Sequence, residues 1–129
     1  MKGTAMPVIT APVSATHELP GASFTALVGP ARGARDTSVW RVELAPGSAP
    51  TPHHVTREEV FVILSGRARV TIAGQVSEAG AGDAVLVPAR TPFAIACAGE
   101  TPLTALCCLP IGGQAVLPGG EPFTPPWAQ

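Results

Sequence analysis

Two histidines and two glutamates lie within seven residues in the segment Gly47-Ser-Ala-Pro-Thr-Pro-His53-His-Val-Thr-Arg-Glu-Glu59-Val-Phe-Val-Ile-Leu-Ser-Gly66. An apolar run follows Glu59 directly, and its β-branched and aromatic composition is typical of a buried strand. Imidazole nitrogens and carboxylate oxygens at such short spacing can close on one metal ion or one polar ligand. The segment is therefore the candidate functional site, and the rest of the chain is expected to be its scaffold.

The size and composition of the chain predict one globular domain. It has 129 residues, of which 46% are hydrophobic and 13% are charged, and these values exclude a disordered chain. The apolar content also indicates that a partner covers part of the surface. The net charge is −1 and the basic residues form no stripe, so nucleic acid is not an expected partner.

The cysteines and the N-terminus predict a cytoplasmic protein. The three cysteines, Cys97, Cys107 and Cys108, are odd in number, and two of them are adjacent. Adjacent strand residues point to opposite faces, so Cys107 and Cys108 are expected to face apart and not to bridge. The first residues lack the apolar core of a secretory signal, and no stretch approaches the ~20 apolar residues of a membrane span.

Glycine and proline punctuate the whole chain, which favours short strands over helices. The sequence predicts strands over 24–28, 37–45, 53–55, 59–64, 67–73, 76–78, 84–87, 93–97 and 103–109. The turn signal Ser65-Gly66 predicts that 59–64 and 67–73 form a hairpin. Regular turn spacing in one small domain predicts an all-β sandwich or barrel.

Both ends of the chain differ from this central part. Residues 1–22 are interpreted as an N-terminal arm, in which 8–10 could add an edge strand or remain a partly ordered terminus. Residues 23–110 form the expected barrel. Residues 111–129 are a Pro/Gly-rich tail, and Trp127 is expected to anchor it to the body.

The spacing of the central segment resembles a known motif. Gly47-x5-His53 followed by Glu59-x6-Gly66 resembles the first motif of the cupins, Gly-x5-His-x-His-x3,4-Glu-x6-Gly. The stretch over 82–97 resembles their second motif, Gly-x5-Pro-x-Gly-x2-His-x3-Asn. The resemblance covers about residues 37–109. It implies a single-domain jelly-roll β-barrel (a double-stranded β-helix) with a metal or small-ligand pocket in its mouth. Such barrels are usually dimeric, so the resemblance also implies a homodimer.

This chain departs from the cupin pattern at the metal ligands. The family typically holds its metal with three histidines and one glutamate. His53 and Glu59 match the pattern, whereas Val55 and Phe93 stand where the second and third histidines belong. Under the alternative motif spacing, His54 takes the second histidine position, but Pro52 then stands at the first. Arg90 and Cys97 replace the glycine and the asparagine of the second motif.

Two functional hypotheses follow, and the catalytic residues stay unknown in both. In the first, the protein binds a small molecule beside a degenerate metal site, because two ligand positions are apolar. In the second, it is a metal-dependent cupin enzyme of the dioxygenase or isomerase type, in which His53, His54 and Glu59 hold one divalent Zn, Fe, Mn or Ni ion. The expected pocket residues are His53, Val55, Glu59, Phe61, Phe93, Ile95 and Cys97, the last three on one face of a strand.

Overall fold

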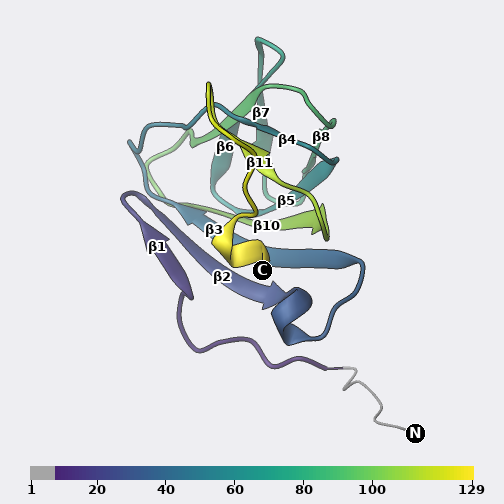
Figure 1. Ribbon diagram of the computed structural model, residues 1–129. Helices are drawn as coiled ribbons and strands as arrows, with labels where there is room; N and C mark the ends of the chain where they lie inside the picture. Colours follow the sequence, from purple (N-terminus) through teal and green to yellow (C-terminus); the bar gives the residue numbers. More distant parts are fainter. Residues whose placement is uncertain (1–7) are drawn as a thin grey trace, which may run out of the picture.

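The computed structural model describes residues 8–129, and over this range the chain forms eleven strands and two short 3-10 helices (Figure 1). The strands are β1 (His17–Leu19), β2 (Ala22–Val28), β3 (Thr37–Leu44), β4 (His54–Val55), β5 (Glu59–Ser65), β6 (Arg67–Ile72), β7 (Gln75–Gly80), β8 (Ala84–Val87), β9 (Phe93–Cys97), β10 (Leu103–Pro110) and β11 (Ala115–Val116). The 3-10 helices are η1 (Pro30–Arg32) and η2 (Pro126–Ala128). Neither helix is long or apolar enough to cross a membrane, and residues 8–129 contain no other. The all-β prediction is confirmed.

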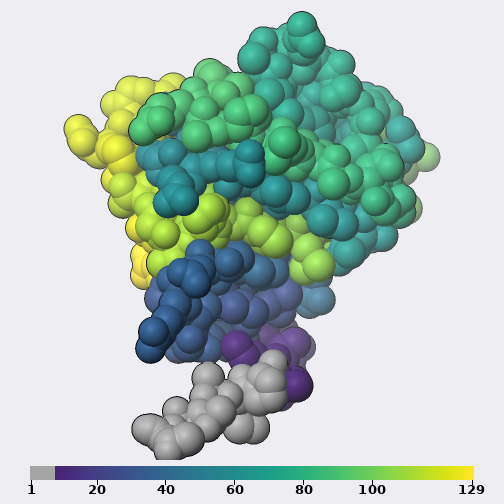
Figure 2. Space-filling view, turned by 90° about the vertical axis from the view of Figure 1, so that its right-hand side faces the viewer, coloured from purple at the N-terminus to yellow at the C-terminus, as the bar shows by residue number. Residues whose placement is uncertain are grey.

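The strands form three antiparallel sheets. The large sheet has the order β1-β2-β3-β10-β5-β8, a second sheet has the order β7-β6-β9, and β11 pairs with β4. In Figure 2 the yellow-green residues of β10 form a band between the blue N-terminal strands and the teal strands, as this order requires. Strands from both halves of the chain are therefore neighbours in the large sheet.

The core lies on the inner faces of these sheets. Along β3, Trp40 and Val42 are buried whereas Arg41 and Glu43 are exposed, which is the alternation that a half-buried strand requires. Strand β10 alternates in the same way along its whole length. Each large apolar side chain that is removed from water contributes about 1.5–3 kcal/mol. The predicted alternation of 37–45 is confirmed.

The predicted hairpin at Ser65-Gly66 is wrong. Strand β5 pairs with β10 and β8, whereas β6 pairs with β7 and β9, so the chain leaves the large sheet at Gly66 and enters the small one. Gly66 has φ +80, and a Cβ at this position would lie 2.5 Å from the carbonyl oxygen of Pro102. The hairpin is formed instead by β6 and β7. Its two turn residues, Ala73 and Gly74, both have positive φ, as a type I′ turn requires.

Strand β1 forms an edge of the large sheet, and the C-terminal segment packs against this sheet. Strand β1 pairs with β2, and residues 8–10 lie in no strand. The C-terminal segment, yellow in Figure 1, passes across β2 and β3. Its η2 helix is fixed by the Ser38 hydroxyl, which donates a hydrogen bond of 2.9 Å to the carbonyl oxygen of Ala128. Trp127 stacks on Phe24, which confirms that this residue anchors the tail.

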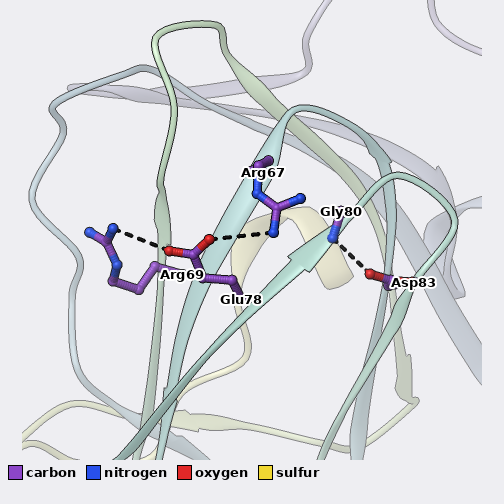
Figure 3. Close-up of polar contacts among 5 residues, drawn as sticks. All are labelled: Arg67, Arg69, Glu78, Gly80 and Asp83. Atoms are coloured by element: carbon purple, nitrogen blue, oxygen red, sulfur yellow. Dashed lines mark hydrogen bonds and ion pairs between the residues drawn. The ribbon is translucent and has the colours of Figure 1, made fainter.

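The outer face of the small sheet carries a cluster of charges (Figure 3). The carboxylate of Glu78 lies 3.4 Å from the guanidinium groups of both Arg67 and Arg69. Next to it, the backbone N–H of Gly80 donates a hydrogen bond of 2.8 Å to Asp83. Because these side chains are largely exposed, each ion pair contributes at most about 1 kcal/mol. Arg69 is therefore a suitable control position, because its side chain contacts Glu78 on the outer face and does not line the inner faces.

Candidate ligand-binding cavity

A cavity of about 480 Å³ is enclosed by the inner faces of the sheets. Strands β3, β5, β9 and β10 supply twelve of its lining residues, and the others come from the β1–β2 hairpin, the segment over 48–55 and the C-terminal segment. Apart from His53, Glu59 and Cys107, the cavity has no ionisable lining residue in the described part of the chain. The cavity is therefore an apolar space with a few polar groups, which is typical of small-molecule sites.

His53 enters this cavity immediately before β4. Its backbone pairs with Phe93 through two hydrogen bonds of 3.0 and 2.8 Å, and the two rings lie 4.4 Å apart. Its Nδ1 is 2.8 Å from the carbonyl oxygen of Thr51, a geometry that assigns the ring proton to Nδ1 and leaves Nε2 as an acceptor. Burial lowers the pKa of His53. The hydrogen bond to Thr51 opposes this effect, and the neighbouring His54 lowers the pKa again. The imidazole is neutral at neutral pH.

Glu59 is the first residue of β5 and is only 4% exposed. Burial raises the pKa of its carboxyl group to about 8, so the group is protonated at neutral pH. Within residues 8–129 this carboxyl has no hydrogen-bond partner and neither oxygen is fully enclosed by protein, so it faces the cavity. A protonated carboxyl in this position can donate a hydrogen bond to a ligand.

Two predicted site residues lie outside the cavity. His54 pairs with Val116 between β4 and β11, and it points away from the face that His53 and Val55 share. Cys97, at the end of β9, donates from its thiol to the carbonyl oxygen of Thr101 at 3.0 Å and does not line the cavity. The other expected pocket residues do line it: His53, Val55, Glu59, Phe61, Phe93 and Ile95.

The thiol that lines the cavity belongs to Cys107. This residue is completely buried on β10, and burial, followed by Glu59 and Cys108, raises the pKa of its thiol. Cys108, its neighbour, lies on the outer face, as the adjacency of the two cysteines predicts. The alternation of β10 could have identified Cys107 as a pocket residue. No local pattern indicated that Phe24 and Trp127, from the two ends of the chain, also line the cavity.

The residues of the cavity do not fit a divalent metal ion. Val55 and Phe93 occupy two of the four ligand positions of the motif, and His54 faces away. No group of three His, Cys, Asp or Glu side chains in the range 8–129 is arranged to hold an ion. Catalytic metal sites use about three protein ligands, and here His53 and Glu59 supply at most two.

Comparisons with known proteins identify the family. Residues 40–109 match the family described as "Cupin domain", and the chain belongs to this family. An uncharacterized protein of Methanocaldococcus jannaschii is 40% identical over 55 residues, a match that spans 43% of this chain and 44% of that protein. The resemblance found in the motifs is thus confirmed.

Solved structures confirm the fold. The polyketide cyclase RemF from Streptomyces resistomycificus superimposes with a TM-score of 0.65 at 20% identity, over 85% of this chain and 79% of that chain. The oxalate decarboxylase of Lactobacillus farciminis, in a formate complex, has a TM-score of 0.66 at 21% identity, over 78% of this chain and 30% of that chain. At these identities the similarity establishes the cupin fold alone.

Proposed function

We propose that this cupin binds a small, mainly apolar molecule in its central cavity and holds no metal ion there. The observation that carries the proposal is the cavity of about 480 Å³, which lies within the size range of small-molecule sites. Its apolar lining favours an apolar ligand body. The few polar groups would fix the orientation of that body.

His53 and Glu59 have complementary roles in this proposal. Both groups are neutral at neutral pH, because burial lowers the pKa of the imidazole and raises that of the carboxyl. The Glu59 carboxyl offers a hydrogen-bond donor and the Nε2 atom of His53 offers an acceptor. A ligand with one carbonyl or hydroxyl group can satisfy a buried carboxyl that otherwise lacks a partner, and this hydrogen bond would favour binding.

Metal analysis tests the proposal against a metal-dependent enzyme. Protein purified without a His tag is incubated with Fe, Mn, Zn or Ni and dialysed, and its metal content is measured for the wild type, His53→Ala and Glu59→Gln. We expect no stoichiometric metal in any of them. Stoichiometric metal in the wild type that is lost in both variants would overturn the proposal and favour the dioxygenase- or isomerase-type alternative, in which His53, His54 and Glu59 hold the ion.

We also propose that two copies associate through the outer face of the large sheet. Across four strands this face carries two rows of cross-strand neighbours: Val39, Cys108, Val60 and Leu86, then Arg41, Leu106, Val62 and Ala84. Leu86 is 57% exposed, although it continues an apolar row. Arg41 and Glu43 lie on the same face with opposite charges, so a two-fold axis that passes between them would pair Arg41 with Glu43 of a second copy.

The cysteines support a cytoplasmic location as a further part of this proposal. All three are free: Cys107 is buried, and Cys97 and Cys108 are partly buried. Free thiols persist in reducing compartments.

A further inference from the structure

Every phenylalanine and tryptophan of this protein lines this cavity. The chain has four Phe, two Trp and no Tyr. The six lining rings are Phe24, Trp40, Phe61, Phe93, Phe123 and Trp127. A core needs large apolar side chains, but it does not need all the aromatic ones around a single space. We infer that the ligand is an uncharged aromatic molecule, an inference that rests on the proposed binding function.

The rings come from the large sheet, the small sheet and the C-terminal segment. Phe61 and Phe93 meet edge to face, with centroids 6.0 Å apart and planes inclined by 62°, and His53 lies tilted against Phe93. Trp127 and Phe24 form a parallel pair on another wall. A flat ligand ring can therefore meet both ring faces and ring edges, and such aromatic contacts contribute about 0.5–1.5 kcal/mol each beyond the area they bury.

The charges of the chain exclude an anionic ligand from this space. The chain has seven arginines, and none of them lines the cavity. A carboxylate or phosphate that is removed from water needs a cationic partner, and an unpaired buried charge is strongly unfavourable. Glu59 adds a group that would repel an anion whenever it is ionised. A neutral hydroxyl or carbonyl on the ring satisfies the same carboxyl without this cost.

Part of this aromatic wall lies outside the segment that defines the family. Phe24, Phe123 and Trp127 are not within residues 40–109, although they line the cavity with the family residues. The selectivity for an aromatic ring therefore depends on the two ends of this chain as well as on its barrel. Trp127 is the most direct probe of this contribution, because it lines the cavity and belongs to no strand.

The inference is tested with three probes that share one carbon frame. Calorimetric titrations at pH 7 compare naphthol (aromatic, neutral), naphthoate (aromatic, anionic) and decahydronaphthol (saturated, neutral). We expect naphthol to bind at least about tenfold more tightly than either other probe, which corresponds to one or two aromatic contacts. Phe61→Leu keeps an apolar side chain but removes a ring, and it should weaken naphthol about tenfold while leaving decahydronaphthol unchanged.

Two further variants give the matched comparison. Trp127→Phe keeps a ring on the wall and should bind naphthol within a few-fold of the wild type, whereas Arg69→Ala, on the outer face of the small sheet, should not differ. Circular dichroism before each titration establishes that the variant is folded. Equal binding of decahydronaphthol and naphthol would overturn the aromatic inference and leave the proposed apolar binding standing. Naphthoate binding as tight as that of naphthol would overturn the requirement for an uncharged ligand.

A different outcome of the same titrations would reject the proposed function itself. If none of the three probes binds, and the neutral single-ring probe phenol does not bind either, the cavity is not a site for small apolar molecules. Both the proposed function and the aromatic inference would then be rejected.

Discussion

The indole of Trp127 lies flat on the ring of Phe24, with centroids 3.6 Å apart and planes within 2° of parallel. The two residues are more than a hundred positions apart in the sequence, so their contact ties the C-terminal segment to β2. The same pair forms part of the cavity wall. Stability and ligand binding therefore share this contact.

Replacement of Trp127 by alanine should lower the free energy of unfolding by about 2 kcal/mol, because a partly buried ring and its aromatic partner are lost together. Denaturant unfolding monitored by circular dichroism measures the loss. Trp127→Phe is the control, and it should cost less than about 1 kcal/mol. An alanine variant as stable as the wild type would show that the stack does not hold the tail.

Glycine-to-alanine substitutions at Gly66 and Gly74 separate two causes of destabilisation. Both residues have a left-handed φ, of +80 and +81, but a Cβ at Gly66 would lie 2.5 Å from the Pro102 carbonyl oxygen, whereas nothing lies within 4 Å of one at Gly74. Gly74→Ala should therefore cost only the backbone strain, about 1–2 kcal/mol. Gly66→Ala should cost at least about 2 kcal/mol more. Equal losses in thermal or urea unfolding would contradict the close approach at the crossing between the sheets.

Glu59 should make the protein less stable as the pH rises. Its pKa is about 8 in the folded protein, whereas the ordinary value of a glutamate is 4.5. Between pH 4.5 and pH 8 the folded state therefore binds more protons than the unfolded state. The contribution of Glu59 to the free energy of unfolding is fully present below about pH 4.5 and is lost as the pH rises through 8. The total loss is on the order of several kcal/mol. His53 has the opposite dependence, since its pKa is lowered and its contribution is lost as the pH falls below about 6.5.

Urea unfolding of the wild type and of Glu59→Gln at pH 7 and pH 9 isolates the contribution of Glu59, because His53 is neutral at both values and the buried thiols are common to both proteins. The wild type should be clearly less stable at pH 9. Glu59→Gln, which keeps a neutral polar group, should flatten this difference. A pH dependence that is the same in the variant and in the wild type would mean that another group is responsible.

Leu106→Arg should convert a dimer into a monomer. Leu106 lies in the middle of the outer rows of the large sheet, between Arg41 and Val62, and a charge there would be desolvated by a second copy. Light scattering should give twice the 13.1 kDa chain mass for the wild type and 13.1 kDa for the variant. Val76→Arg is the control, because this exposed apolar residue lies on β7 in the small sheet. A wild-type mass of 13.1 kDa would reject the dimer.

The strands could be predicted from the sequence because their signals are local. The alternation of Trp40, Val42 and their exposed neighbours predicts β3 without knowledge of its partners, and the strand at Ala84–Val87 has the predicted bounds. Strand pairing is different. Ser65-Gly66 has the same local signal whether the chain turns back as a hairpin or crosses to another sheet, and the deciding contact is with Pro102, far along the chain.

The cavity was predictable only in part for the same reason. Spacing identified His53 and Glu59, and alternation identified Phe93 and Ile95. Cys97 shares their strand face, but β9 ends there and its thiol bonds to the following loop. Whether a strand ends before or beyond the cavity depends on the packing of the whole sheet. A local residue pattern therefore cannot predict it.

Because part of the cavity wall comes from the C-terminal segment, substitutions in this segment and in the barrel strands have different consequences. Substitutions in the barrel alter paired strands and disturb the register of several neighbours at once. The segment over 117–127 is held by the backbone pair between Phe123 and Ala115 and by the stack of Trp127 on Phe24, and most of its other backbone groups are not paired with a strand. Mutations there can reshape ligand preference while the frame stays intact, so new specificities could evolve in this cupin by replacement of one short terminal segment.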